Sequence, residues 1–334
     1  MSAARSVRSV LVTGVAGFIG FHVALKLLKQ GIRVIGLDSL TPYYSPLLKT
    51  ARLAELSKLD ADFSFAAVDI SQFANLAGAL RNDKPDVCIH LAAQAGVRFS
   101  LESPFTYGES NLVGFLTVLE YCRQTAIPHL VYASSSSVYG QREDVPFTET
   151  SDTSHPSSLY AATKKANEVM AYSYSHCFGM RTTGLRFFTV YGPWGRPDMA
   201  YYSFAARMRS GQPIHVYGDG SSRRDYTFVD DAVESVWRIA IQEPTEEMAQ
   251  SSKLARVYNI GNARPYSVID LIRCLELSLG VTAVRHNIEQ PRADVYETFA
   301  DTHALMRDYG FTPNTVLEVG ISQFAKWYDG YSEA

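Results

Sequence analysis

Long apolar runs, paired cysteines and an excess of one charge are all missing from this sequence. No stretch of about 18 uninterrupted apolar residues occurs, which argues against a membrane-spanning helix. The four cysteines (Cys88, Cys122, Cys177 and Cys274) form no CxxC pair, and their neighbours are mostly apolar. We therefore expect reduced and mostly buried thiols instead of disulfides or metal ligands. The eight histidines show no metal-binding spacing, so no metal site is expected.

The charge balance narrows the range of partners. The 334 residues carry a net charge of -3, without a basic stripe or a polybasic run. This balance predicts neither a nucleic-acid nor a membrane partner. The opening segment, MSAARSVRSVLVTG, leads from a short apolar run into a glycine-rich turn, which is unlike a secretory signal. With 46% hydrophobic and 19% charged residues, the composition is typical of a globular protein. Because its cysteines are expected to be reduced, we expect the protein to be cytoplasmic.

Strand-like and helix-like segments alternate over the first 135 residues. Apolar strands are predicted near 9–14, 33–38, 64–70, 86–93 and 129–135, and amphipathic helices near 20–31, 73–82 and 109–123. A further strand is expected from about 181, and it leads into a loop near Gly192. Regular alternation predicts an α/β fold of the Rossmann type, with a doubly wound parallel sheet.

The pattern changes after about Gly192. Loops, a short strand near 213–220, a helix near 230–241, a strand near 256–261 and a last helix near 316–331 follow. We expect residues 1–190 to form the sheet domain and residues 191–334 to form mainly a smaller, mixed α/β substrate domain. Segments between about 225 and 262 are expected to return to the first domain.

A glycine motif joins the first predicted strand to the first helix. VLVTGVAGFIG places Gly14, Gly17 and Gly20 in a GxxGxxG pattern. Glycines let the backbone approach a pyrophosphate, which the start of the helix then attracts. Asp38 follows at the end of the second strand, where a carboxylate binds both ribose hydroxyls and repels a 2′-phosphate. The motif therefore predicts binding of NAD in preference to NADP.

Other expected cofactor contacts lie at the following strand ends and in the motif itself. The strand ends contribute Asp69 and Ile70, then Leu91, Ala92, Ala93 and Gln94, where adenine and ribose would reach. The remaining expected contacts are Phe18, Ile19, Asn111, Tyr160 and Lys164.

Tyr160 and Lys164 lie four residues apart in the segment LYAATKKANE, so they share one helix face. A tyrosine with an ordinary pKa near 10 is a poor base at neutral pH. A lysine ammonium and a positive nicotinamide ring would both stabilise its phenolate. The pair predicts removal of a proton from an alcohol as hydride leaves the same carbon.

With these motifs, the sequence resembles the extended short-chain dehydrogenase/reductase family over nearly its whole length. Within that family it is most similar to UDP-glucuronate 4-epimerases. The closer match is carried by residues 38–56, HLAAQAGVRFS (90–100), ASSSSVYG (133–140), RFFTVYGPWGRPDMA (186–200) and SSRRDYTFVDD (221–231). The chain departs from the family in QPRADV (290–295), where the family usually reads QPGDV and Arg292 is an additional residue.

The resemblance assigns roles to the serine run. It implies that Ser135, 25 residues before Tyr160, is the catalytic hydroxyl that shares a proton with that tyrosine. Related dehydratases and decarboxylases carry acids directly before VYG, where this chain has Ser136 and Ser137. Neutral hydroxyls bind a substrate carboxylate that an acid would repel. We expect Ser136, Ser137, Thr189 and Arg196 to hold such a carboxylate, and the other implied substrate contacts are Arg98, Ser100, Tyr217 and Arg224.

The resulting expectation is NAD-dependent C4 epimerisation of a UDP-hexuronic acid through a 4-keto sugar, with NAD tightly bound and recycled. The alternatives are a 4-epimerase of UDP-glucose or UDP-N-acetylglucosamine, a UDP-glucuronate 5-epimerase, and a non-catalytic NAD-sensing protein. The resemblance also implies a homodimer formed by helices near 101–123 and 158–176, and a role in polysaccharide biosynthesis.

Overall fold

The computed structural model describes residues 7–81, 83–242, 245, 253–289 and 296–331. Arg292 and the whole QPRADV segment (290–295) lie outside these residues. No helix in the described ranges is both long and apolar enough to span a membrane.

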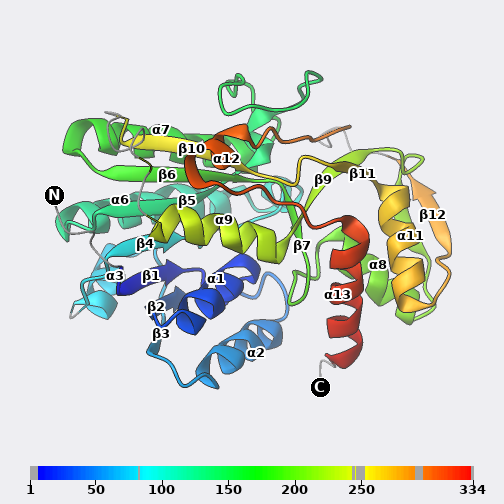
Figure 1. Ribbon diagram of the computed structural model, residues 1–334, viewed down its shortest axis with the longest axis horizontal. Coiled ribbons are helices and arrows are strands. Elements are labelled where there is room, and N and C mark those ends of the chain that lie inside the picture. Colours follow the sequence, from blue (N-terminus) through cyan, green and yellow to red (C-terminus); the bar gives the residue numbers. More distant parts are fainter. Residues whose placement is uncertain (1–6, 82, 243–244, 246–252, 290–295, 332–334) are drawn as a thin grey trace.

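A seven-stranded sheet forms the centre of the molecule (Figure 1), with the strand order β10-β6-β5-β4-β1-β2-β3. All neighbouring strands in this sheet are parallel. Because β1 is flanked by β2 and β4, the chain reverses its direction of winding there, and ligands bind beyond the strand ends at such a point. The strands are β1 (Ser9–Thr13), β2 (Arg33–Asp38), β3 (Phe63–Ala67), β4 (Val87–His90), β5 (His129–Ser135), β6 (Arg181–Phe187) and β10 (Ala255–Ile260).

Alternate residues of each strand enter two different cores, because successive side chains point to opposite faces of a sheet. In β1, Val10 and Val12 belong to the core that also contains residues of α1 (Phe18–Lys29) and α9 (Val229–Ile241). Leu11, between them, belongs to the other core. That core also contains residues of α3 (Phe73–Leu80), α6 (Gly114–Gln124) and α7 (Leu159–Phe178). Helix α2 (Pro46–Ser57) packs beside α1. The structure confirms the predicted doubly wound α/β fold.

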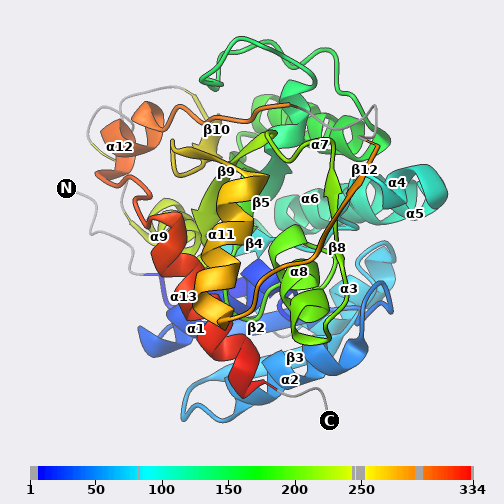
Figure 2. The same ribbon diagram turned by 90° about the vertical axis from the view of Figure 1, so that its right-hand side faces the viewer.

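The smaller part of the molecule faces the viewer in Figure 2. β9 (Arg223–Phe228) pairs with β7 (Thr189–Tyr191) on one side and with β11 (Pro265–Ser267) on the other. β8 (Ile214–Tyr217) and β12 (Arg285–Ile288) form a second, two-stranded sheet. Three helices pack around them: α8 (Ala200–Arg209), α11 (Val268–Leu279) and α13 (Leu317–Gly330). Between β9 and β11 the chain contributes α9 and β10 to the central sheet layer, and α12 (His303–Tyr309) packs on β10.

The helix expected near 109–123 is interrupted at its start. Two short helical turns, α4 (Phe99–Glu102) and α5 (Pro104–Tyr107), lead into a π-helical turn at Gly108–Val113, and α6 follows. Asn167 donates from Nδ2 to the main-chain oxygen of Asn111 at 2.7 Å. A side chain that takes a helix carbonyl in this way competes with the regular ladder, which accounts for the wider turn.

Candidate active site

The glycine motif brings three backbone segments into direct contact at the end of the sheet. Gly14 has φ +74°, and a Cβ placed on it would lie 2.6 Å from the Ala92 nitrogen. A Cβ on Gly20 would lie 2.0 Å from the Gly14 oxygen. Helix α1 begins after Gly17 without a side-chain cap, so its first N–H groups and its dipole suit an anionic group. The loop therefore fits the pyrophosphate of a dinucleotide.

Asp38 lies at the end of β2, where the glycine motif fixes its carboxylate. Oδ2 accepts the Ala16 N–H at 3.1 Å and Oδ1 accepts the Leu40 N–H at 2.8 Å. Each carboxylate oxygen has a second lone pair, so both can accept a ribose hydroxyl. Nearby, burial lowers the pKa of Lys49, while the Asp38 charge opposes that shift.

Gln94 and Asn111 are joined by two hydrogen bonds. The Gln94 N–H donates to Asn111 Oδ1 at 2.8 Å, and Asn111 Nδ2 donates to the Gln94 oxygen at 3.0 Å. Asn111 Nδ2 also donates to Thr163 Oγ1 at 3.1 Å, and the Asn111 side chain is buried. Its amide thus links the end of β4 to α7. The other expected contacts at strand ends, Asp69, Ile70, Leu91, Ala92 and Ala93, follow β3 and β4 directly.

Tyr160 and Ser135 meet where the start of α7 faces the end of β5. Ser158 caps α7 by accepting the Ala161 N–H at 3.1 Å. Burial raises the pKa of Tyr160, whereas a hydrogen bond with Ser135 and the charge of Arg196 both lower it. Lys164, one turn further on, donates to the Ala133 oxygen at 2.8 Å. Burial lowers the pKa of Lys164 to about 8.

The serine run divides between two environments, as the alternation of a strand requires. Ser134 is buried and donates to Glu168 Oε1 at 2.7 Å. Ser135 faces Tyr160, and its Oγ accepts the Ser137 N–H at 3.2 Å, which caps the short helix η2 (Ser136–Tyr139). Ser136 and Ser137 are half-buried.

A buried ion pair beneath the serines was not predicted. Arg186 of β6 donates from Nε and Nη2 to the two oxygens of Glu168 at 2.8 and 2.9 Å. Arg186 Nη1 also donates to the Tyr139 hydroxyl at 2.9 Å. Glu168 follows Lys164 by four residues on α7, as Lys164 follows Tyr160. This spacing puts all three on one helix face, and it was the signal in the sequence that could have identified Glu168. The pair fixes the catalytic helix against β5 and β6.

Arg196 lies close enough to Tyr160 for its charge to act on that hydroxyl. It forms a bidentate pair with Asp198, with Nε to Oδ1 at 3.0 Å and Nη2 to Oδ2 at 2.7 Å. The Tyr43 hydroxyl donates to the same Oδ2 at 3.3 Å. The structure therefore gives Arg196 an internal carboxylate partner, while its charge still acts on the pKa of Tyr160. Neither Asp198 nor Tyr43 was predicted as a site residue.

A buried arginine connects the loop that carries Arg196 to the glycine motif. Arg52 of α2 donates to the Ala16 oxygen at 2.8 Å, to the Trp194 oxygen at 2.6 Å and to the Gly195 oxygen at 3.1 Å. Its side chain is fully buried. Both ends of the expected site are thus fixed by one guanidinium.

The other expected substrate contacts lie in two places: Arg98 and Ser100 follow β4, and Thr189, Tyr217 and Arg224 lie in the smaller part. The Arg98 guanidinium lies 4.2 Å from the centre of the Tyr217 ring, so these two residues are brought together. Ser100 is buried, and its hydroxyl donates to the main-chain oxygen of Val97 at 2.6 Å, so the hydroxyl proton is already used by the backbone. Arg224 donates to the Tyr296 oxygen at 3.1 Å. Thr189 is half-buried at the start of β7.

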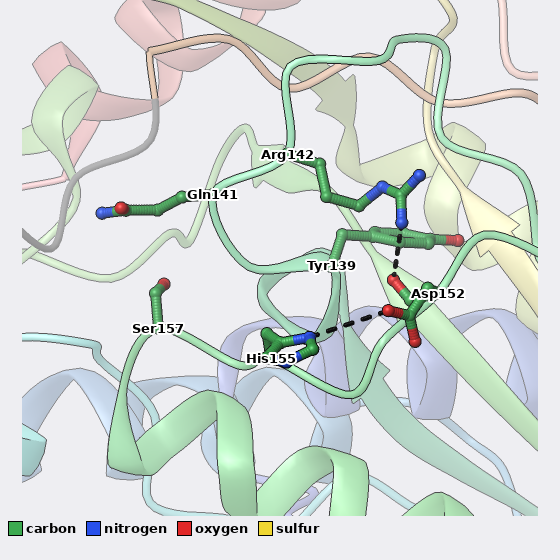
Figure 3. A pocket seen from close by; sticks show the side chains of 6 residues that line it. All are labelled: Tyr139, Gln141, Arg142, Asp152, His155 and Ser157. Carbon is green, nitrogen blue, oxygen red and sulfur yellow. Dashed lines mark hydrogen bonds and ion pairs between the residues drawn. The ribbon is translucent and has the colours of Figure 1, made fainter.

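Figure 3 shows a pocket of about 410 Å³ beside η2, on the segment that leads to α7. Gln141 and Ser157 lie on one side of it, and Arg142 and Asp152 lie on the other. The Asp152 main-chain oxygen accepts from Arg142 at 3.3 Å, and its carboxylate lies 3.7 Å from His155 Nδ1. None of the predicted site residues is among those that line this pocket. Within the described ranges, no group of three or more His, Cys, Asp or Glu side chains could hold a metal.

Removal of hydride and a proton from an alcohol is the chemistry this arrangement can perform, on the fold of the short-chain dehydrogenases/reductases. The profile of the NAD dependent epimerase/dehydratase family matches residues 10–261, and the chain belongs to that family. It is 45% identical to Protein CapI of Staphylococcus aureus, over 96% of this chain and 98% of that protein. It is 43% identical to UDP-glucuronate 4-epimerase 3 of Arabidopsis thaliana, over 97% and 77%. The crystal structure of the UDP-glucuronic acid 4-epimerase from Bacillus cereus, in complex with UDP-glucuronic acid and NAD, superposes with a TM-score of 0.87. That alignment has 30% identity and covers 96% of this chain and 99% of the other.

Proposed function

We propose that this protein is an NAD-dependent UDP-glucuronate 4-epimerase, which interconverts UDP-glucuronate and UDP-galacturonate. The contact between Tyr160 and Ser135 carries the proposal, because it lies where residues 135–137 carry hydroxyls and no acid, whereas Ser134 points to Glu168. The proteins similar to this chain include enzymes named for that reaction.

The chain's own residues fit NAD, and different residues would hold the different parts of this cofactor. The glycine motif and the start of α1 would hold the pyrophosphate, Asp38 the adenosine ribose, and Lys164 the nicotinamide ribose. When bound, NAD accepts a hydride from C4 of the sugar and returns it to the opposite face of the ring.

Tyr160 would remove the proton from the 4-hydroxyl and later return it. The Ser135 hydroxyl, which acts on the pKa of Tyr160 and donates to Ser137 Oγ at 3.1 Å, would share that proton. Burial keeps Tyr160 neutral in the free chain, so its action as a base depends on nearby positive charge. Arg196 supplies such a charge, and the Lys164 ammonium is one helical turn away. After oxidation, the 4-keto sugar must rotate in the site so that its opposite face receives the returning hydride.

The oxidised substrate is a β-keto acid, which loses CO₂ when the bond to its carboxylate lies parallel to the π orbitals of the carbonyl. We propose that Ser136, Ser137, Thr189 and Arg196 hold the carboxylate out of that alignment. Arg196→His should then increase the UDP-pentose side product, measured by chromatography of the nucleotide sugars. An unchanged product ratio in this variant would contradict the proposed grip on the carboxylate.

The first test of the function is proton NMR of UDP-glucuronate with purified protein and no added NAD. Appearance of UDP-galacturonate without UDP-xylose would support both the reaction and a resident, recycled cofactor. If nothing forms, NAD is added first, and then UDP-glucose or UDP-N-acetylglucosamine. Conversion of a neutral sugar alone would favour the other 4-epimerases, and inversion at C5 would favour the 5-epimerase. Binding of NAD(H) without any turnover would favour a sensing protein.

An exposed apolar surface on the helices beside the site supports a homodimer. Phe105 is 90% exposed and Leu101 67%, and on α7 Tyr172 is 64% exposed and Val169 58%. A second copy that packs the same helices against them would cover these side chains. We propose a homodimer, and a monomer found by light scattering at micromolar concentration would refute it. We also propose a cytoplasmic enzyme of polysaccharide biosynthesis, with residues 191–334 forming mainly the nucleotide-sugar domain.

A further inference from the structure

Arg196 is held by Asp198, and Asp198 in turn by Tyr43, and neither of these two partners has a predicted role. Its side chain is 22% exposed and that of Asp198 is 31% exposed, so the pair is half-buried at the edge of the site. Among the described residues, the hydrogen bonds of Arg196 engage Nε and Nη2. The Nη1 edge of the guanidinium therefore remains for a substrate carboxylate, because the fork of arginine can serve two partners at once.

Tyr43 connects this pair to the loop that follows Asp38. Its hydroxyl donates to Asp198, and its ring packs on Phe99 with centres 4.9 Å apart. Gly96 has φ +104°, and a Cβ placed on it would lie 2.7 Å from the Tyr43 hydroxyl. The close approach of this backbone fixes where the Tyr43 hydroxyl lies, and thus the oxygen of Asp198 to which it donates.

The same cluster reaches the catalytic tyrosine. The Tyr107 hydroxyl donates to the Ala95 oxygen at 2.9 Å and also to the Gly96 oxygen, and its ring lies edge-on to Tyr160 with centres 6.1 Å apart. Segments that contain Tyr43, Gly96, Tyr160 and Arg196 therefore meet around one point. A shift of the guanidinium at this point would change how it meets a substrate carboxylate bound next to Tyr160.

We propose that Asp198, held by Tyr43, is a positioning residue that aims Arg196 at the substrate carboxylate and so limits loss of CO₂. This inference rests on the proposed function. If the carboxylate is not held, the ring can change its shape until the bond between C5 and the carboxylate lies parallel to the π orbitals of the 4-keto carbonyl. That bond then breaks, its electron pair forms an enolate with the carbonyl, CO₂ leaves, and a proton adds at C5. The product is a UDP-4-keto-pentose.

The test compares three variants of the purified enzyme on UDP-glucuronate, with UDP-galacturonate and decarboxylated products separated by chromatography. Asp198→Asn should raise the ratio of decarboxylated to epimerised product about tenfold, the effect of losing one hydrogen bond to a charged group. Asp198→Glu keeps a carboxylate and should restore most of the wild-type ratio. Tyr43→Phe keeps the ring on Phe99 and should raise the ratio by a smaller factor.

A matched control exists elsewhere in the chain. Arg142 pairs with Asp144 at the same two-residue spacing on an exposed loop, so Asp144→Asn removes the same charge and should leave the product ratio unchanged. Binding gives a second readout, because Asp198→Asn should weaken binding of UDP-glucuronate but not of neutral UDP-glucose. A merely structural role would weaken both.

The outcomes separate this inference from the function on which it rests. If the wild type converts no UDP-glucuronate, the proposed function fails. If the wild type epimerises cleanly and Asp198→Asn keeps the wild-type product ratio and binding, the positioning role is overturned. If Asp198→Asn does not fold, Tyr43→Phe decides, and an unchanged ratio in that variant overturns the role.

Discussion

Replacement of Glu168 tests whether the buried ion pair holds helix α7, which carries Tyr160. Glu168→Gln removes the negative charge from the pair but keeps nearly the same shape, so the Arg186 cation would remain 3% exposed without a counter-charge. Breaking a buried pair in this way costs about 3–5 kcal/mol. Since a whole domain is stable by roughly 5–15 kcal/mol, the loss should be large in urea unfolding. Turnover should also fall, because Tyr160 lies on the same helix as Glu168.

The double variant Glu168→Leu with Arg186→Met separates the charges from the packing. It removes both charges at once. Its free energy of unfolding should therefore lie closer to the wild-type value than the free energy of unfolding of Glu168→Gln does. Glu120→Gln is the control, because its pair with Arg123 lies on the surface and should contribute little. A Glu168→Gln variant as stable as Glu120→Gln would refute the reasoning, and so would a double variant whose loss equals the sum of two large single losses.

The pH dependence of stability gives an independent measure of the same pair. Burial acts to raise the pKa of Glu168, but the hydrogen bonds and charge of Arg186 hold it below its ordinary value. A lowered carboxyl pKa stabilises the folded state above the pKa of the unfolded chain, and this stabilisation is lost as pH falls through the folded pKa. As pH falls from the pKa of Glu168 in the unfolded chain through its lower pKa in the folded protein, the free energy of unfolding should therefore decrease more in the wild type than in Glu168→Gln. Parallel acid-unfolding curves for the two proteins would contradict this account.

Three further predictions follow from other parts of the structure. Gly20→Ala places a Cβ 2.0 Å from the Gly14 oxygen, so the protein should purify with little NAD, which acid extraction and absorbance would measure; retained NAD would argue against the assigned loop. Arg52→Met leaves buried carbonyls such as that of Trp194 without a donor and should lower the free energy of unfolding by about 2–4 kcal/mol, measured in urea; a change under about 1 kcal/mol would contradict the role of that guanidinium. Phe105→Glu should shift the protein toward monomer in light scattering, and an unchanged dimer would place the interface elsewhere.

The doubly wound parallel sheet could be predicted from the sequence because strand and helix periods alternate regularly over the first half of the chain. The position of β10 at the edge of the sheet beside β6 follows from contacts between distant segments, which period and composition do not record. The interruption before α6 was missed for a similar reason, because it depends on Asn167, which is 56 residues beyond Asn111.

Part of the candidate site was predictable from local patterns alone. The glycine motif, Asp38 and the spacing of Tyr160 and Lys164 each carry their chemistry within a few residues of one another. Arg52 and Tyr43 carry no such local sign, since one lies in the middle of an ordinary helix and the other in a loop. Their importance arises only where α2 and the 193–198 loop meet.

The Arg52 guanidinium also limits how this protein can be redesigned. It donates to the oxygens of Ala16, Trp194 and Gly195, so the glycine motif and the loop around Arg196 are held by hydrogen bonds from the same side chain. A graft of that loop from a relative with another sugar preference would have to present two carbonyls at the same places, or bring its own α2. Selection for a new sugar in this scaffold therefore acts on α2 and the Arg196 loop together, although Arg52 and Trp194 are 142 residues apart in sequence.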